Sequence, residues 1–222
     1  NVGGEKVKEA ANAGTDTVRS EVTFTLTNPT PGDPEIDVSN VENLELTGNA
    51  VIDGTGNALS NKITGNSAAN KLDGLVGTDS LAGGDGDDTY VVENIGDKVK
   101  EDGTGNDTVE SFVTFTLTDP TVVDPNIKVS TIENLTLKGT AAINATGNTL
   151  ANTITGNDAA NTIDGKGGVD AMDGKAGNDT YIVDATGDTV AEANGTTDGT
   201  DTVKSSVTYT ISDVDVENLV LT

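Results

Sequence analysis

The chain of 222 residues carries 37 acidic and 12 basic residues, a formal net charge of −25, and neither Cys nor His. This balance argues against nucleic acid and anionic membranes as partners, since both bind Lys- and Arg-rich surfaces, and it favours cations. Without Cys and His there are no disulfides, no thiolate or imidazole metal ligands, and no histidine general base. No apolar run reaches the length of a membrane span, so we expect no membrane insertion.

The chain has three Tyr, three Phe and no Trp, against 27 Gly. Low hydrophobicity with high charge is one signature of disorder. Here, however, β-branched residues recur regularly between clusters of Gly, Asn and Asp, which is typical of short strands joined by turns. We therefore expect an ordered β structure.

The first elements along the chain form a long repeat. The segment TDTVRSEVTFTLTNP (Thr15–Pro29) returns 91 residues later as NDTVESFVTFTLTDP (Asn106–Pro120) and a third time from Thr200. These segments, and the ENLTL segment that follows, alternate apolar and polar residues as strands do. A Pro-containing loop separates them. The pattern predicts one continuous solenoid with repeat units at 1–93 and 94–184 and a truncated unit at 185–222, excerpted from a longer array.

A nine-residue period lies inside each long unit. Nine residues fit neither an amphipathic helix nor hairpins, but they fit one short strand plus one tight turn, so two repeats complete a coil of eighteen residues. Stacked coils place like residues above like at the strand spacing of about 4.8 Å. We predict an all-β, right-handed parallel β-solenoid of tandem 91-residue units, with almost no helix and roughly ten to twelve coils. The apolar ladder comprises Ile63, Leu72, Leu81, Tyr90 and Val99, then Ile154, Ile163, Met172, Tyr181 and Val190.

One turn of the ladder is strongly acidic. The stretch from Gly83 to Val92 reads GGDGDDTYVV, with three glycines and three aspartates before a strand-like segment. Crowded carboxylates repel one another unless a cation lies between them. The stretch therefore predicts a cation site in the turn.

These residues resemble a known family. GGDGDDTYV (Gly83–Val91) is similar to the glycine-rich nonapeptide G-G-x-G-x-D-x-U-x of repeats-in-toxin (RTX) proteins, and the tracts between ladders look like the long repeats of large secreted RTX-type adhesins. The resemblance implies a β-roll with Ca²⁺ between successive turns, held by glycine carbonyls and the Asp at position six. Residues eighteen apart face the same edge, which pairs Asp79 with Asp97, pairs Asp170 with Asp188, and puts Asp88 between Asn70 and the Asn106–Asp107 turn. Carried over, the expected metal residues are Asp79, Gly83, Gly84, Asp85, Gly86, Asp88, Asp97, Asp107, Asp170, Asp179 and Asp188.

Several turns depart from the family pattern. Position six is Asn at residues 61, 70, 152 and 161, and Leu or Ala replaces the glycine at position four in the same nonapeptides. Asn is neutral and stacks in hydrogen-bonded ladders without an ion, so we expect the Asn turns to be ion-free. For the Asp turns, the alternative to calcium is a solvated turn capped by its own Asp.

The sequence favours a structural function. We expect a repeat segment of a secreted, extracellular or cell-surface fibre or adhesin, stiffened by calcium and not an enzyme, because every acidic pair recurs with the repeat whereas a catalytic site normally occurs once. The expected partners are further copies of the repeat, in cis or head-to-tail in trans as a filament, and a surface or matrix ligand. The alternative is a calcium-responsive β-roll carrier region of a secreted enzyme. Surface binding by Thr rows is disfavoured, because these rows lie 91 residues apart rather than on consecutive coils.

Overall fold

The described part of the chain is built from strands alone. The computed structural model contains 20 strands and no helix in that part, which confirms the all-β prediction. None of the described residues belongs to a helix of the length and apolar character needed to cross a membrane. The described residues are 7–10, 14–27, 37–118, 127–192 and 199–222.

The chain groups into two compact units. Unit 1 comprises Asn1–Asp107 with Asp124–Ile127, and unit 2 comprises Thr108–Val123 with Lys128–Thr222. This division follows spatial contacts, so the repeat boundaries expected after residues 93 and 184, and the expected continuity of the solenoid, stay predictions.

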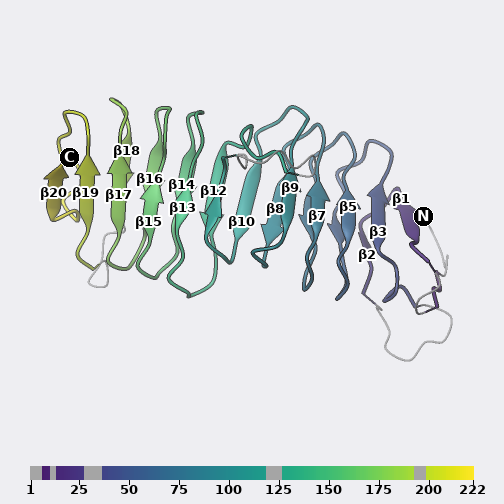
Figure 1. Ribbon diagram of the computed structural model, residues 1–222. Coiled ribbons are helices and arrows are strands. Elements are labelled where there is room, and N and C mark those ends of the chain that lie inside the picture. Colours follow the sequence, from purple (N-terminus) through teal and green to yellow (C-terminus); the bar gives the residue numbers. More distant parts are fainter. Residues whose placement is uncertain (1–6, 11–13, 28–36, 119–126, 193–198) are drawn as a thin grey trace. The chain divides into compact units, whose positions relative to one another are not determined.

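Unit 1 stacks its strands in two parallel sheets (Figure 1). One sheet has the order β1-β3-β5-β7-β9 and the other the order β2-β4-β6-β8, so the chain alternates between the two sheets at every strand. The strands are β1 (Thr17–Ser20), β2 (Phe24–Thr25), β3 (Asn43–Leu46), β4 (Gly54–Thr55), β5 (Lys62–Thr64), β6 (Lys71–Asp73), β7 (Ser80–Ala82), β8 (Thr89–Val92) and β9 (Lys98–Lys100).

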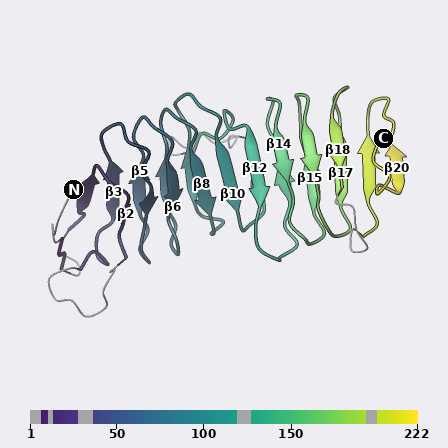
Figure 2. The ribbon, with the colours of Figure 1, turned by 180° about the vertical axis from the view of Figure 1, so that it is seen from behind.

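Unit 2 repeats this arrangement (Figure 2). Its sheets have the orders β10-β12-β14-β16-β18 and β11-β13-β15-β17-β19-β20, and every pairing within them is parallel. The strands are β10 (Thr108–Ser111), β11 (Phe115–Thr116), β12 (Asn134–Leu137), β13 (Ala145–Thr146), β14 (Thr153–Thr155), β15 (Thr162–Asp164), β16 (Ala171–Asp173), β17 (Thr180–Val183), β18 (Thr189–Ala191), β19 (Thr202–Ser205) and β20 (Asn218–Leu221).

The register shows what one coil contains. Ile63 of β5 pairs with Leu81 of β7, eighteen residues on, as two nine-residue repeats per coil require. In the long tract the paired residues are further apart: Thr17 pairs with Asn43, and Phe24 with Gly54. Because these coils consume more residues, the described part of the chain forms about nine turns rather than the expected ten to twelve. The parallel β-solenoid is confirmed, and its right-handedness stays a prediction.

The apolar ladder forms the core. All ten ladder residues are buried, and the phenol rings of Tyr90 and Tyr181 are fully enclosed. Complete burial of an aliphatic side chain contributes roughly 1.5–3 kcal/mol to stability. The nine-residue spacing thus predicted the core correctly.

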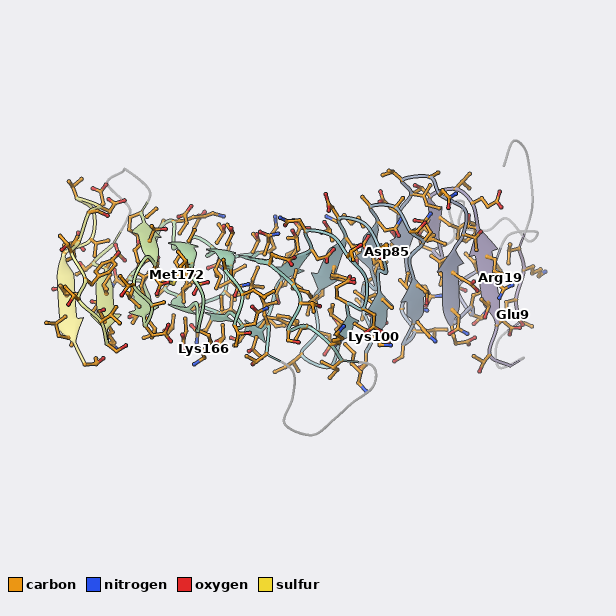
Figure 3. The ribbon with its side chains drawn as sticks, turned by 90° about the horizontal axis from the view of Figure 1, so that it is seen from above. Glu9, Arg19, Asp85, Lys100, Lys166 and Met172 are labelled. Carbon is orange, nitrogen blue, oxygen red and sulfur yellow. The ribbon has the colours of Figure 1, made fainter. Side chains whose placement is uncertain are left out.

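The turns require left-handed backbone at specific places. Gly84 and Gly86, at positions two and four of the acidic nonapeptide, have φ values of +101° and +111°. Position two of three other nonapeptides holds a residue with a Cβ in the same region: Leu75 (φ 61°), Lys166 (φ 63°) and Lys175 (φ 73°). Lys166 projects outward (Figure 3), with its Nζ 2.8 Å from Asp164 Oδ2. A left-handed residue with a Cβ costs roughly 1–2 kcal/mol, so these three turns are strained.

We expect Lys175→Gly to stabilise the protein, because Lys175 occupies the place that Gly84 has in unit 1. Relief of strain, less the extra entropy of glycine in the unfolded chain, leaves about 0.5–1 kcal/mol. Thermal melting should show an increase in Tm of about 1–4 °C, at about 2–4 °C per kcal/mol. The reverse change, Gly84→Lys, should lower Tm. A lower Tm for Lys175→Gly would contradict the strain argument.

Candidate metal centre

Position-six side chains connect successive coils through one of their two terminal atoms. Each lies immediately before a strand, and where it is Asp, its Oδ1 accepts the backbone N–H of the position-six residue one coil earlier. Asn61 N donates to Asp79 Oδ1 at 2.7 Å, and Asn70 N donates to Asp88 Oδ1 at 2.8 Å. In unit 2, Asn152 and Asn161 donate in the same way to Asp170 (2.8 Å) and Asp179 (2.6 Å).

The second oxygen of these four acids has no donor. Asp79, Asp88, Asp170 and Asp179 are each 1% exposed, and their Oδ2 atoms are buried without a hydrogen-bond partner. Buried polar atoms in native proteins are normally satisfied, and a buried carboxylate without compensation is costly. Each of these oxygens therefore calls for a proton or a cation.

At the Asn turns the amide oxygen takes the place of that second oxygen, and it accepts a backbone N–H of its own turn: Asn61 Oδ1 accepts from Asn57 N at 2.7 Å, and Asn70 Oδ1 accepts from Asn66 N at 2.8 Å. The amide nitrogen makes the bond to the preceding coil. Asn61 Nδ2 donates to the carbonyls of Val41 and Glu42, both at 3.2 Å, and Asn70 Nδ2 donates to the carbonyl of Ile52 at 2.6 Å. The amide thus binds the backbone of the preceding coil without an ion. This hydrogen bonding supports the prediction that the Asn turns are ion-free.

Two of the expected metal residues are capped by their own turns. Asp97 Oδ1 accepts from Asp79 N at 3.0 Å, which brings the predicted pair together, and its Oδ2 accepts from the backbone N–H groups of Glu93 and Asn94. Asp188 makes the corresponding bonds in unit 2. Both oxygens of each acid are already used, as in the capped-turn alternative, and a role for these two acids in metal binding stays a prediction.

The glycine-rich turn itself is held by close stacking. A Cβ on Gly83 would lie 2.1 Å from Asp88 Oδ2, so only glycine leaves room for the carboxylate. The exposed Asp85 uses its Oδ1 to accept from Thr104 N (3.1 Å) and Thr104 Oγ1 (3.0 Å) on the next turn. Gly86 N donates to Thr104 O at 2.7 Å. Asp85 thus connects two turns, and its expected contact with the ion stays a prediction.

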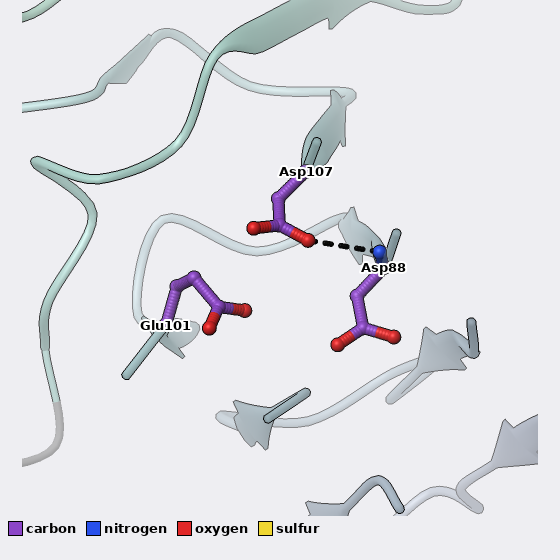
Figure 4. Close-up of side chains that lie close together, drawn as sticks. All are labelled: Asp88, Glu101 and Asp107. Carbon is purple, nitrogen blue, oxygen red and sulfur yellow. Dashed lines mark hydrogen bonds between the residues drawn. The ribbon is translucent and has the colours of Figure 1, made fainter. Parts of the chain in front are cut away.

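Three buried carboxylates converge at the end of the first ladder (Figure 4). Asp88 precedes β8, Glu101 follows β9, and Asp107 precedes β10; one oxygen of each lies within 4.8 Å of the other two. That limit is about twice a Ca²⁺–oxygen distance of 2.3–2.6 Å, so one ion can contact all three. Asp88 N donates to Asp107 Oδ1 at 2.9 Å, which places Asp88 beside the next turn as predicted.

The same arrangement recurs in unit 2 with Asp179, Glu192 and Asp201. Asp179 N donates to Asp201 Oδ1 at 2.7 Å. Glu192 is 5% exposed, and its Oε2 is buried without a hydrogen-bond partner. The predicted metal residue Asp179 therefore has two acidic neighbours.

Sequence reasoning missed Glu101, Glu192 and Asp201. Both glutamates occupy position one, where the nonapeptide motif has glycine, so the motif gave no reason to single them out. The available signal was the substitution itself: an ionisable residue replaces glycine at the same place in both units. Asp201 was hidden because three additional residues displace it from the 91-residue offset.

A tyrosine hydroxyl holds each glutamate. The Tyr90 hydroxyl donates to Glu101 Oε2 and accepts from Gly83 N at 2.9 Å, and the Tyr181 hydroxyl donates to Glu192 Oε1. Burial, and then the hydrogen-bonded glutamate, raise the pKa of both phenols above the ordinary value. Both hydroxyls therefore remain protonated donors at neutral pH.

Burial also raises the pKa of the acids. It raises the pKa of Asp88 and Asp179 to about 7 and that of Asp79 and Asp170 to about 6, with neighbouring carboxylates adding to the effect. Burial raises the pKa of Glu192 to about 8. All the groups that converge are oxygen ligands, which suit a hard cation such as Ca²⁺.

The fold and these carboxylates define a cation-binding β-solenoid repeat. Residues 55–90 and 146–181 match the family model of the RTX calcium-binding nonapeptide repeat (4 copies). The chain therefore contains an RTX-type β-roll repeat region, as the sequence predicted, and calcium is its ion. No curated protein and no solved structure matches the chain in the corresponding comparisons. The matched segments include Asp79, Asp88, Asp170 and Asp179 and end at the two tyrosines, so both glutamates lie outside them.

The raised pKa values predict an unusual dependence of stability on pH without calcium. Between about pH 4 and pH 7–8 the folded chain binds protons that the unfolded chain has lost, so the free energy of unfolding falls as pH rises through this window. Thermal melting in a chelator should therefore give a lower Tm at pH 8 than at pH 5. In millimolar calcium the stabilisation by the ion should grow over the same window. A chelated protein whose Tm rises from pH 5 to pH 8 would contradict the assignment.

Asp88→Asn should change the stability of the calcium-free protein and its response to calcium in opposite directions. The amide removes a buried charge and supplies donors, so the calcium-free protein should gain roughly 1–3 kcal/mol, the cost of an unsatisfied buried polar group. The gain in Tm on adding calcium should shrink. Asp53→Asn is the matched control, because Asp53 is exposed, is not among the expected metal residues, and an Asn oxygen can keep its bond to Lys71 N. An unchanged calcium response in Asp88→Asn would remove Asp88 from the site.

Proposed function

We propose that this chain is a structural segment of a secreted or cell-surface fibre or adhesin, and that calcium stiffens it. The chain is a structural calcium-binding repeat segment. The observation that carries the proposal is the recurrence, once per 91-residue unit, of buried carboxylates where two successive coils meet. A segment that lengthens by copying one unit suits a spacer, because each coil contacts only its neighbours.

Stiffening follows from the position of the charges. In unit 1, Asp88 belongs to one turn and Asp107 to the turn stacked on it, so their carboxylates repel each other when ionised. A divalent cation replaces this repulsion with attraction between coils. A ligand that binds only the folded chain stabilises it by RT ln(1 + [L]/Kd), and extracellular calcium modules have Kd values of about 10⁻⁴–10⁻³ M. Bending or opening the stack would then require loss of the ion.

The proposal includes no catalysis. Cys and His do not occur in the chain, and the buried carboxylate clusters come in two equivalent copies. The partners we propose are neighbouring copies of the repeat, in the same chain or head-to-tail between chains, together with a surface or matrix ligand. The carrier region of a secreted enzyme remains the competing function, since it makes the same use of calcium.

The stiffening can be measured on the 222-residue chain. We expect millimolar calcium to raise Tm by at least several degrees and to raise the force that unfolds a single molecule held in an atomic force microscope. Magnesium at the same concentration is the control, because it prefers a smaller octahedral shell and retains its water. Equal unfolding forces in calcium and in chelator would contradict stiffening.

The cellular role is tested on the full-length protein. Deleting one or more 91-residue units should reduce attachment of the source cells to a surface, or shorten the fibres seen on them by electron microscopy. A full-length chain with a separate catalytic domain whose activity needs this region would instead favour the enzyme carrier.

A further inference from the structure

Glu101 and Glu192 occupy position one of the nonapeptide, where glycine leaves room for the position-six carboxylate. Where position one is glycine, the position-six carboxylate folds over it: a Cβ on Gly74 would lie 2.3 Å from Asp79 Oδ2. In those nonapeptides the acid follows position one by five residues, as Asp88 follows Gly83, whereas Asp107 follows Glu101 by six. The longer turn admits a side chain at position one. That side chain is an acid, and it is buried.

An oxygen without a partner faces each glutamate. An ideal Cβ built on Gly83 lies 2.1 Å from Asp88 Oδ2 and 2.3 Å from the Tyr90 hydroxyl, so these two atoms lie on the same side of the turn. The hydroxyl binds Glu101, and Figure 4 shows the carboxylates of Asp88, Glu101 and Asp107 directed toward a common space. Asp88 Oδ2 is buried and accepts no hydrogen bond. A ligand in that space would satisfy it.

The second cluster keeps this arrangement despite an altered spacing. Asp179 and Glu192 lie 91 residues after Asp88 and Glu101, but the third acid, Asp201, lies 94 residues after Asp107. The oxygens still converge within 4.8 Å, and both Asp179 Oδ2 and Glu192 Oε2 lack partners. A turn that only needed a cap would not require three acids to meet again after an insertion.

We propose that Asp88, Glu101 and Asp107, and likewise Asp179, Glu192 and Asp201, form one calcium site per 91-residue unit. Each site takes only its first Asp from a nonapeptide turn and binds calcium more tightly than the Asp79 and Asp170 turns do. The inference rests on the calcium binding proposed above. Three carboxylates converge at each of these sites, whereas the Asp79 and Asp170 turns each combine one unsatisfied acid with one capped acid. Calcium affinity is tuned by the number of charged ligands and the rigidity of the site. Each tyrosine is a positioning residue that holds the glutamate in place.

The test uses the whole 222-residue chain with the double substitution Glu101→Gln and Glu192→Gln. Isothermal titration with calcium should show the loss, or a weakening of at least tenfold, of the two tightest sites, while the weaker sites keep their number and affinity. Terbium(III), an oxygen-binding probe excited through nearby tyrosine, should lose its sensitised luminescence in parallel. Glu9→Gln is the matched control, because Glu9 follows the same K-V-K sequence but belongs to neither cluster among the described residues.

A second variant keeps the charge and the fold. Tyr90→Phe with Tyr181→Phe retains all six carboxylates, so it should keep both sites with a several-fold lower affinity, and circular dichroism reports whether each variant remains folded. If the wild-type chain binds no calcium, the proposed function fails. If it binds calcium and the Glu→Gln variant is folded with unchanged stoichiometry and affinities, only the present inference fails.

Discussion

The stacking of the coils depends on which hydrogen bonds the two terminal atoms of each position-six side chain can make. One atom bonds the backbone of the coil before it: in Asp it is Oδ1, which accepts an N–H, and in Asn it is Nδ2, which donates to a carbonyl. The other atom is buried in the same turn and must also be satisfied. In Asn it is the amide oxygen, which accepts a backbone N–H of its own turn. In Asp79, Asp88, Asp170 and Asp179 it is a carboxylate oxygen that has no donor and takes a proton or calcium.

Because position six is Asn in some turns and Asp in others, each unit contains two kinds of contact between coils. The early nonapeptides, at Asn61 and Asn70, are closed by hydrogen bonds alone, and the later ones, at Asp79 and Asp88, each bury a carboxylate oxygen without a donor. The apolar ladder is equally buried in both parts, so the hydrophobic core does not distinguish them. We infer that the Asn coils remain stacked when calcium is absent and that the Asp coils respond to its concentration.

Much of the fold could be predicted from the spacing of apolar residues. A nine-residue ladder allows one strand and one turn, and Ile63, Leu81 and Val99 indeed stack on one another. The number of coils was overestimated, because spacing in the ladder says nothing about how many residues the long tract spends between Phe24 and Gly54. Sequence distance is a poor guide wherever loops are long.

The site was only partly predictable, for a related reason. Asp88 and Asp179 could be found because they occupy a motif position, whereas Glu101 and Glu192 act from a position that the motif reserves for glycine. Asp97 fits the motif, yet its own turn supplies the donors that saturate it. A motif specifies residue types, and only the structure shows which oxygen is left without a donor.

The most direct measurement of the central claim is a crystal structure of the calcium-loaded chain with anomalous scattering to locate the ions. The account predicts anomalous density beside Oδ2 of Asp88 and Asp179, within contact of Glu101 and Glu192, and none at the Asn61 or Asn70 turns. Density at the Asn turns, or none beside Asp88 and Asp179 in a calcium-saturated crystal, would contradict it.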